Sequence, residues 1–124
     1  MRILMIDDSN VMRSHQRSVL EKMGDHQIEE ACNGMDALQK LKAFEPELIL
    51  LDWNMPVMDG ISFLKAFRAM GRKTPVIMVT TEAEKPRVME AIKAGVSAYC
   101  IKPFSLETIR AVIEKTMGAF RKAG

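Results

Sequence analysis

Short apolar segments of strand length recur along this chain, and segments with the period of an amphipathic helix lie between them. The four clearest apolar runs cover 3–6, 48–51, 76–79 and 98–101. None alternates apolar with polar residues, which is typical of parallel strands that are covered on both faces. Because parallel strands need a crossover connection, usually a helix, the pattern restricts the chain to an α/β fold.

A fifth segment, 27–31, is a weaker strand candidate because Glu29 and Glu30 stand beside Ile28. Two charged residues do not suit the middle of a sheet that is covered on both faces. We therefore expect this strand at an edge of the sheet.

Five segments with helical period follow the strands. Their expected starts are at Asp8–Ser9, Asn33–Gly34, Asp59–Gly60, Pro86 and Ser105. Gly24, Gly71 and Gly95 are expected to end the first, third and fourth helices. The 124 residues then form one domain, 1–124, which is a doubly wound α/β domain with a five-stranded parallel sheet and five helices. Right-handed crossovers and a polar second strand favour the order 2-1-3-4-5, which is that of flavodoxin-like folds.

The charge balance and the first residues narrow the class of protein. Charged residues make up 27% of the chain and the net charge is +2, with no basic tract, so we expect no nucleic-acid partner. The apolar start is broken by Asp7 and Asp8 and is too short for a signal peptide or a membrane span, so we expect a cytoplasmic protein. Cys32 and Cys100 belong to no metal-ligand spacing and are expected to be buried, reduced thiols.

Polar residues follow the ends of the strands that would lie side by side in the sheet. Asp7 and Asp8 follow the first strand and Asp52 the third, while Thr80 and Lys102 follow the fourth and fifth. In an open α/β sheet, ligands bind beyond the carboxyl ends of the strands, near the point where the strand order reverses. We therefore expect these five side chains to gather at one edge of the sheet and to form the functional site.

Three carboxylates gathered in one cleft repel one another and must either take up protons or bind a cation. Mg²⁺ fits best, because it is held by one or two carboxylates together with waters and phosphate oxygens. His15 and His26 stand at no zinc-ligand spacing. Asp52 can act as a nucleophile and form an aspartyl phosphate. The ammonium of Lys102 would then contact a phosphoryl oxygen, and the hydroxyl of Thr80 would swing toward another.

Several short motifs surround these residues. They are Asp7–Asp8, Asp52 followed by Met55–Pro56 and Asp59–Gly60, then Thr80, and then Lys102–Pro103. Each is weak alone, but in this order and at the ends of strands they resemble the response-regulator receiver family along essentially the whole chain. The run 52–56, together with Tyr99, resembles the stand-alone chemotaxis members of that family in particular.

The resemblance implies a role for each site residue. Asp52 would accept a phosphoryl group from a histidine kinase, and Lys102 would contact that group. Mg²⁺ would be held by Asp8, by Asp52 and by the backbone carbonyl of Asn54, while Asp7 would bind it through water. The chain would therefore act as a switch that phosphorylation turns on.

The resemblance also implies a coupled pair, Thr80 and Tyr99, in which the hydroxyl moves to the phosphoryl group and the ring swings inward. It implies a cis peptide bond between Lys102 and Pro103, which would aim the lysine. Thr81 departs from the chemotaxis members, which have a small alanine there. The larger side chain would hinder access by a phosphodonor or a phosphatase.

A receiver of this kind is not an enzyme in the usual sense, since it catalyses only its own phosphorylation and dephosphorylation. The resemblance implies a monomer that binds a histidine kinase, with a phosphatase as a further candidate partner. Output would go to a flagellar motor switch protein, or to another downstream protein, through the fourth helix, the fifth strand and the fifth helix. A phosphorelay intermediate would have the same site residues.

Two other functions on a similar fold are less consistent with these residues. A Mg²⁺-dependent phosphohydrolase of the haloacid dehalogenase type also forms an aspartyl phosphate, but it needs a second acid two residues after the nucleophile, where this chain has Asn54. A flavodoxin-like cofactor binder would place its phosphate loop after the first strand, where Asp7 and Asp8 would repel the ligand. We interpret Asp59–Gly60 as a turn and helix start, and we expect Trp53 to be partly exposed at the mouth of the site.

Overall fold

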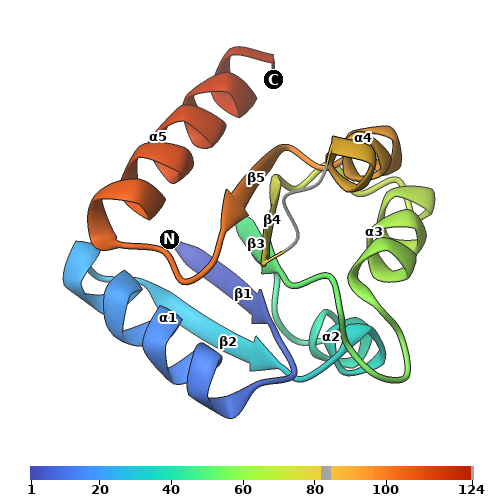
Figure 1. The fold of residues 1–124 in the computed structure, drawn as a ribbon, viewed down its shortest axis with the longest axis horizontal. Coiled ribbons are helices and arrows are strands. Elements are labelled where there is room, and N and C mark those ends of the chain that lie inside the picture. Colours follow the sequence, from blue (N-terminus) through green and yellow to red (C-terminus); the bar gives the residue numbers. More distant parts are fainter. Residues whose placement is uncertain (82–84, 124) are drawn as a thin grey trace.

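The computed structural model describes residues 1–81 and 85–123 and has a parallel sheet with helices on both faces (Figure 1). The strands are β1 (Arg2–Ile6), β2 (Gln27–Ala31), β3 (Leu48–Leu51), β4 (Val76–Thr80) and β5 (Ala98–Ile101). The helices are α1 (Asn10–Met23), α2 (Gly34–Lys40), α3 (Gly60–Ala69), α4 (Lys85–Ala94) and α5 (Leu106–Ala123). The strands are all parallel in the order β2-β1-β3-β4-β5, so the predicted fold class and strand order are confirmed.

The three central strands are buried on both faces. Every residue of β3 and β4 is buried, and so is every residue of β1 except the first. One hydrophobic cluster joins the sheet to Ala37, Phe67 and Ala91, which belong to α2, α3 and α4. A second cluster joins it to Leu20 and Ile113, which belong to α1 and α5, and Figure 1 shows the same division of the helices. Burial on both faces explains why these strands are apolar without alternation.

The two edge strands differ from the central ones. β2 is partly exposed along most of its length and carries Glu29 and Glu30, so its predicted place at an edge is confirmed. β5 forms the opposite edge, and its residues Tyr99 and Ile101 are apolar or aromatic but not fully buried.

Hydrogen-bonding side chains begin the helices at the predicted places. The hydroxyl of Ser9 accepts a hydrogen bond from the backbone N–H of Met12 at 3.2 Å, and the hydroxyl of Ser105 accepts one from Thr108 at 3.1 Å. Pro86 lies in the first turn of α4, where its missing N–H has no helical partner to lose. Helix starts were therefore predictable from capping chemistry.

Glycines follow α3 and α4 where the sequence predicts helix ends. Gly71 and Gly95 have φ angles of 81° and 101°, in the left-handed region that glycine adopts without a steric penalty. Within the described part of the chain, no helix is long and apolar enough to cross a membrane.

The two cysteines are both free thiols, but only one is buried. Cys100 lies in β5 and is buried, whereas Cys32 is exposed, so the prediction that both are buried is wrong for Cys32. The reason is its place just beyond the last residue of edge strand β2, where the backbone leaves the sheet. Its N–H there bonds to the carboxylate of Asp36 at 3.0 Å.

Candidate functional site

Backbone hydrogen bonds bring the polar strand ends together. The N–H of Asp52 donates to the carbonyl of Ile6 at 2.9 Å, which places the residue after β3 beside the end of β1. The N–H of Lys102 donates to the carbonyl of Thr80 at 3.0 Å, which places the residue after β5 beside the end of β4. The predicted gathering of these residues is therefore a direct result of parallel pairing in the order observed.

Three carboxylates form a compact acidic pocket at this edge. One oxygen from each of Asp7, Asp8 and Asp52 lies within 4.8 Å of the other two. Asp7 and Asp52 are buried, with 1% and 5% of their surface exposed, whereas Asp8 is exposed. Oxygen ligands in this number, with one open to solvent, fit a hard divalent cation that keeps part of its water shell.

Lys102 bridges the two buried carboxylates. Its Nζ lies 2.9 Å from Oδ2 of Asp7 and 3.0 Å from Oδ1 of Asp52, and its side chain is only 10% exposed. Burial acts to lower the pKa of this lysine, but the hydrogen bonds to Asp7 and Asp52 outweigh it and raise the pKa. Lys102 therefore remains a cation, and the peptide bond to Pro103 is cis as expected.

The single positive charge of Lys102 does not neutralise the negative charges of the three carboxylates in the pocket. Burial, together with the negative charge of Asp7, raises the pKa of Asp52 from an ordinary value of 3.8 to about 6. The hydrogen bonds from Lys102 and from the backbone N–H of Trp53, at 3.0 and 2.9 Å, act in the opposite direction but do not cancel the effect. An added cation would remove this repulsion, so the residues present fit a divalent metal ion.

Asp7 has further donors that hold its carboxylate in place. Its Oδ1 accepts a hydrogen bond from the N–H of Ser9 at 2.9 Å, and its Oδ2 accepts one from Nε2 of Gln16 at 3.4 Å. Gln16 is 2% exposed and is not among the predicted site residues. The sequence could have indicated Gln16, because it is a polar residue at a position on the apolar face of an amphipathic helix. A buried polar side chain needs a hydrogen-bond partner.

The remaining predicted residues lie around the pocket. Thr80 is fully buried at the end of β4, and Thr81 after it is exposed. Tyr99 is partly buried in β5, opposite Met78 of β4, and it packs against the cluster on the α2–α4 side of the sheet. Asn54, two residues after Asp52, is exposed at the start of the loop that follows β3. The structure thus places Thr80 at the carboxyl end of β4, beside Lys102, and Tyr99 on the neighbouring strand β5.

Trp53 is buried, so the prediction that it is partly exposed at the mouth of the site is wrong. It is 2% exposed and belongs to the core cluster between the sheet and α2–α4. The chain folds back after it, because the N–H of Gly60 donates to the carbonyl of Trp53 at 2.8 Å. The guanidinium of Arg87 on α4 then lies 4.8 Å from the centre of the indole ring.

The loop from Asp52 to α3 has the structural role that we predicted. Oδ1 of Asp59 accepts a hydrogen bond from the N–H of Ser62 at 2.8 Å and caps α3. A Cβ on Gly60 would overlap the carbonyl oxygen of Asp52, so only glycine allows this close approach. Val57 in the same loop has a φ of 69°, which is unfavourable for a β-branched residue.

Taken together, the doubly wound sheet, the acidic pocket at the carboxyl ends of β1 and β3, and the lysine after β5 define a receiver domain. The chain belongs to the response regulator receiver domain family, whose pattern it matches over residues 3–114. It is 38% identical to the chemotaxis protein CheY1 of Helicobacter pylori over 121 residues, which cover 95% of this chain and 98% of that protein. It is also 38% identical to the chemotaxis protein CheY-3 of Vibrio cholerae over 117 residues, which cover 93% and 90% of the two chains.

A solved structure agrees with this assignment. The CheY-like receiver domain protein from Methanospirillum hungatei is 27% identical and superposes with a TM-score of 0.88 over 99% of this chain and 98% of that one. The protein is thus a signalling domain similar to chemotaxis regulators rather than a conventional enzyme. Its acidic triad is typical of the Mg²⁺ site of receivers.

Proposed function

We propose that this protein is a phosphorylation-activated switch, which receives a phosphoryl group on Asp52 from a histidine kinase and signals to a partner protein. The pathway that we propose for it is chemotaxis. The observation that carries the proposal is the buried carboxylate of Asp52, which lies 3.0 Å from Lys102 within a cluster of two further carboxylates. A carboxylate nucleophile beside a fixed ammonium and a group of metal-binding oxygens is the set of groups that phosphoryl transfer to a carboxylate uses.

In the proposed reaction, a carboxylate oxygen of Asp52 forms a bond to phosphorus while the bond from phosphorus to the donor nitrogen breaks. Burial of Asp52 keeps water away from the reacting oxygen. Lys102 already faces Asp52 and Asp7, so its ammonium can stay with Asp7 while it contacts a phosphoryl oxygen. The site therefore offers a fixed positive charge before the phosphoryl group arrives.

We assign the Mg²⁺ ligands as Asp8, Asp52 and the backbone carbonyl of Asn54, with Asp7 acting through a water molecule. Support comes from the exposed position of Asp8 and Asn54 at the rim and from the short distances among the three carboxylates. When bound, the ion supplies neutralisation of the phosphoryl oxygens and of the clustered carboxylates. Asp7 suits an indirect role because its oxygens are already engaged by Ser9 and Lys102.

We further propose that Thr80 and Tyr99 carry the signal away from Asp52. Thr80 is fully buried at the end of β4 and its carbonyl accepts the N–H of Lys102, so a shift of its hydroxyl toward a phosphoryl group alters packing beside β5. Tyr99 lies on β5, against the same core cluster that contains Met78 and Trp53. When Thr80 moves toward the phosphoryl group, the Tyr99 ring can fill the space that Thr80 leaves. The ring then has two positions, outward and inward, and phosphorylation favours the inward one.

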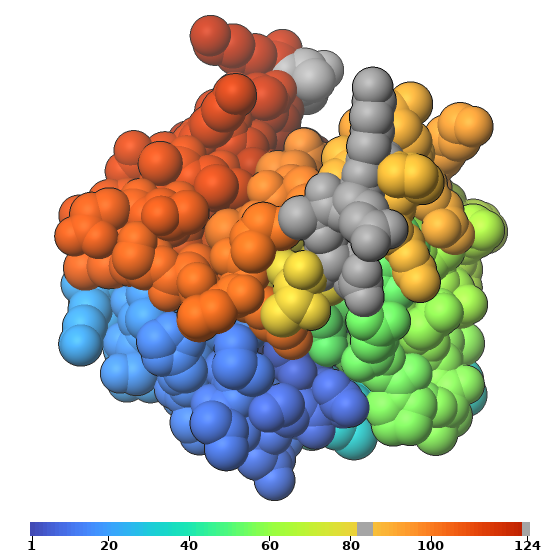
Figure 2. Space-filling model, viewed as in Figure 1, coloured from blue at the N-terminus to red at the C-terminus, as the bar shows by residue number. Residues whose placement is uncertain are grey.

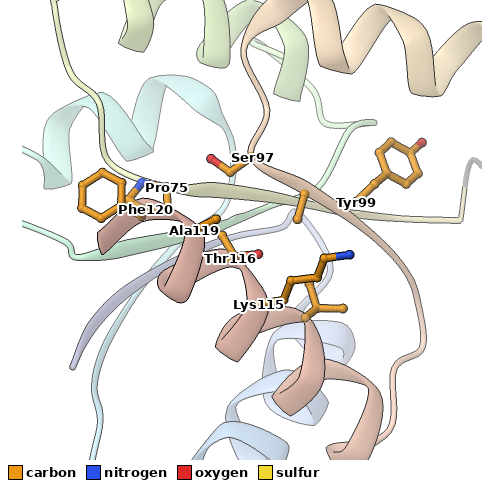
Figure 3. Close-up of a pocket in the computed structure, with 9 residues that line it drawn as sticks. Pro75, Ser97, Tyr99, Lys115, Thr116, Ala119 and Phe120 are labelled. Carbon is orange, nitrogen blue, oxygen red and sulfur yellow. The ribbon is translucent and has the colours of Figure 1, made fainter. Parts of the chain in front are cut away.

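The output surface in this proposal is formed by α4, β5 and α5, and Figure 2 shows α4 and α5 on the same face of the molecule. Apolar side chains are exposed there, including Met89 and Ile92 of α4 at 47% and 55% and Ile101 of β5 at 46%. Between β5 and α5 lies a hollow of about 540 Å³, and Figure 3 shows Tyr99 and Phe120 at its opposite ends. Exposed apolar side chains beside a partly buried tyrosine favour a protein partner.

Chemotaxis is the proposed pathway because two similar proteins, matched over 98% and 90% of their lengths, carry that function in their names. The partner would then be a flagellar motor switch protein. A receiver that acts as a phosphorelay intermediate would use the same Asp52 and Lys102, so only the identity of the partner separates the two. No observation favours the phosphohydrolase, since Asn54 occupies the position of its second acid.

The proposal is tested by incubating the protein with acetyl phosphate, with and without Mg²⁺, while intact mass and Trp53 fluorescence are followed. We expect a Mg²⁺-dependent gain of one phosphoryl group in the wild type and none in Asp52→Asn. Asp59→Asn is the matched control, because it makes the same chemical change in the same loop, outside the carboxylate cluster, and asparagine still caps a helix.

Three outcomes separate the candidates. An adduct on Asp52 supports the switch, and the next step is to compare binding of a motor switch protein with binding of a phosphotransfer protein. The absence of any adduct in the wild type would contradict phosphorylation and indicate a receiver that serves only as a docking domain. Rapid consumption of acetyl phosphate without an adduct would instead favour the phosphohydrolase.

A further inference from the structure

Arg13 of α1 connects the acidic pocket to edge strand β2. One of its terminal nitrogens donates a hydrogen bond to the backbone carbonyl of Asp7 at 2.5 Å, and its Nε donates to Oε1 of Glu30 at 3.0 Å. Its other terminal nitrogen donates to the side chain of Asn10, one turn earlier in α1. The side chain of Arg13 is only 14% exposed, and its contacts with Asp7 and Glu30 are partly buried.

The carbonyl of Asp7 belongs to the peptide bond that joins the two neighbouring acids of the pocket. β1 ends at Ile6, so this peptide lies outside the strand. A turn of the Asp7–Asp8 peptide plane would change the direction in which the side chain of Asp8 leaves the backbone. The hydrogen bond from Arg13 to this carbonyl therefore helps to fix the direction of the Asp8 side chain, which is exposed at the rim of the acidic pocket.

Arg13 is itself held in place from β2. Glu30 accepts from Arg13 through one carboxylate oxygen and from Arg17 through the other, at 3.0 and 2.7 Å. Arg17 also donates to the carbonyl of Ile28 at 3.2 Å, which ties this group of charges to the β2 backbone. A planar guanidinium with donors in a fixed fork can satisfy a carbonyl and a carboxylate together, whereas a lysine ammonium on a flexible stem cannot fix the same geometry.

We propose that Arg13 is a positioning residue for cation binding: braced by Glu30, it holds the Asp7–Asp8 peptide so that the carboxylates of the pocket converge on one ion. The inference rests on the proposed function, because the ion is taken to be Mg²⁺. It also explains why an edge strand carries Glu30, since this glutamate fixes the arginine that shapes the pocket.

The direction in which Mg²⁺ affinity changes when Arg13 is removed distinguishes a positioning role from a purely electrostatic effect of its charge. A positive charge near a cation site weakens cation binding, so removal of Arg13 by charge alone would strengthen Mg²⁺ binding. Removal of a positioning contact disorders the ligands and weakens binding instead. Loss of an outer contact to a metal ligand usually lowers affinity at least about tenfold. The two accounts therefore predict opposite changes in the dissociation constant of Mg²⁺.

The experiment compares Arg13→Gln, Arg13→Lys and the matched control Arg17→Gln, which removes an arginine that shares Glu30 but does not contact Asp7. The Mg²⁺ dissociation constant is measured by calorimetry and by Trp53 fluorescence, since the N–H of Trp53 bonds to Asp52. We expect both Arg13 variants to weaken binding about tenfold and Arg17→Gln to change it by less than about twofold. At saturating Mg²⁺, the rate of phosphorylation by acetyl phosphate should return to within about twofold of wild type.

Unchanged or tighter Mg²⁺ binding in Arg13→Gln would overturn the inference, and so would full rescue by lysine. Thermal unfolding monitored by circular dichroism verifies that each variant is folded. If Arg13→Gln does not fold, Glu30→Gln serves in its place, because it removes the brace and leaves the arginine, and it should weaken Mg²⁺ binding as well. A wild type that accepts no phosphoryl group would contradict the proposed function, whereas a wild type that does so with Arg13 variants of equal Mg²⁺ affinity would contradict only this inference.

Discussion

The two sides of the acidic pocket are built from different interactions. On the α1–β2 side, the contacts are charged and directional, and they connect Asp7 to Arg13 and Arg13 to Glu30. On the α4–β5 side, apolar and aromatic side chains pack on the sheet, with Tyr99 partly buried and Ile101 exposed on the edge strand. Hydrogen bonds with fixed geometry favour one arrangement, whereas apolar contacts can repack with less loss.

This difference indicates a division of labour within one small sheet. In the proposed function, Asp52 accepts a phosphoryl group and needs ligands that do not move, and the side that holds Asp7 offers them. The proposed partner can only sense a change that reaches the surface, and the side that contains Tyr99 has both a buried and an exposed part. The pocket lies between the two because the strand order puts β1 and β3 at the centre and β2 and β5 at the edges.

The largest expected effect is on Asp52, which lies between the two sides. The pKa of Asp52 is about 6 in the folded protein, compared with an ordinary value of 3.8 for an unfolded chain. Between roughly pH 4 and pH 6, Asp52 therefore still holds a proton in the folded protein, whereas the unfolded chain has already released it. The free energy of unfolding of the metal-free protein should therefore fall as pH rises through this window. Asp52→Asn should remove this fall and stabilise the protein at pH 7 by about 2 kcal/mol, after allowance for solvent screening.

Urea denaturation in the presence of a chelator, at several pH values, measures this effect. Asp59→Asn is the control, and it should retain the wild-type pH dependence. Addition of Mg²⁺ should stabilise the wild type more than Asp52→Asn, because binding to the folded state adds to stability. Equal pH dependence in the wild type and in Asp52→Asn would show that burial of Asp52 carries no electrostatic penalty.

The second-largest expected effect is on partner binding and comes from Tyr99, on the α4–β5 side. Tyr99→Ala should leave phosphorylation of Asp52 intact but reduce the partner's preference for the phosphorylated form by about tenfold, since the ring is the proposed link between site and surface. Tyr99→Phe keeps the ring and removes only the hydroxyl, so a comparison of the two variants separates the contribution of the ring from that of the hydroxyl. Binding of the partner to phosphorylated and unphosphorylated protein, measured by fluorescence anisotropy, checks both. An undiminished preference in Tyr99→Ala would remove Tyr99 from the switch.

A smaller effect is expected on the α1–β2 side. Burial acts to raise the pKa of Glu30, but the hydrogen bonds and charges of Arg17 and Arg13 together outweigh it and lower the pKa. Its stabilisation is thus present above the ordinary carboxylate pKa and is lost as pH falls, which is the opposite slope to that of Asp52. Glu30→Gln should lower the free energy of unfolding by about 1 kcal/mol at pH 7 and by less in acid.

The control for this prediction is Glu29→Gln, since Glu29 has a longer and more exposed ion pair with Lys40, at 3.6 Å. It should change the free energy of unfolding by less than about 0.5 kcal/mol. Equal losses in the two variants would mean that the contacts of Glu30 with the two arginines add nothing beyond an ordinary surface charge.

The smallest effect concerns the contact between Arg87 and Trp53. Arg87→Gln removes a cation from the face of the indole and should lower the free energy of unfolding by about 0.5 kcal/mol. Trp53 emission should shift to longer wavelength as water gains access to the ring. Arg72→Gln is a suitable comparison, because Arg72 lies over Phe67 rather than the tryptophan, and Trp53 emission should not change. An unshifted emission in Arg87→Gln would show that the core alone shields Trp53.

Much of this molecule was predictable from the chain itself. Central strands that are buried on both faces must be apolar throughout, so β3 was located to the residue and β1 and β4 to within one residue. The edge strand β5 is also an uninterrupted apolar run and was located to the residue. The places of Asp7, Asp52 and Lys102 followed as well, because parallel strands deliver their carboxyl ends to one edge. Local rules of this kind depend only on a residue and its near neighbours in sequence.

Only the tertiary structure decided the contacts that come from packing one element on another. Trp53 follows a strand end and was expected near the surface, yet the return of the chain to α3 and the position of Arg87 on α4 bury it. The hydrogen bond from Arg13 to the Asp7 carbonyl, with Arg13 held from β2 by Glu30, likewise joins α1 both to β2 and to the residue that follows β1. Such contacts depend on the distances between helices and strands, which side-chain packing sets across the whole core and which no short segment of sequence encodes.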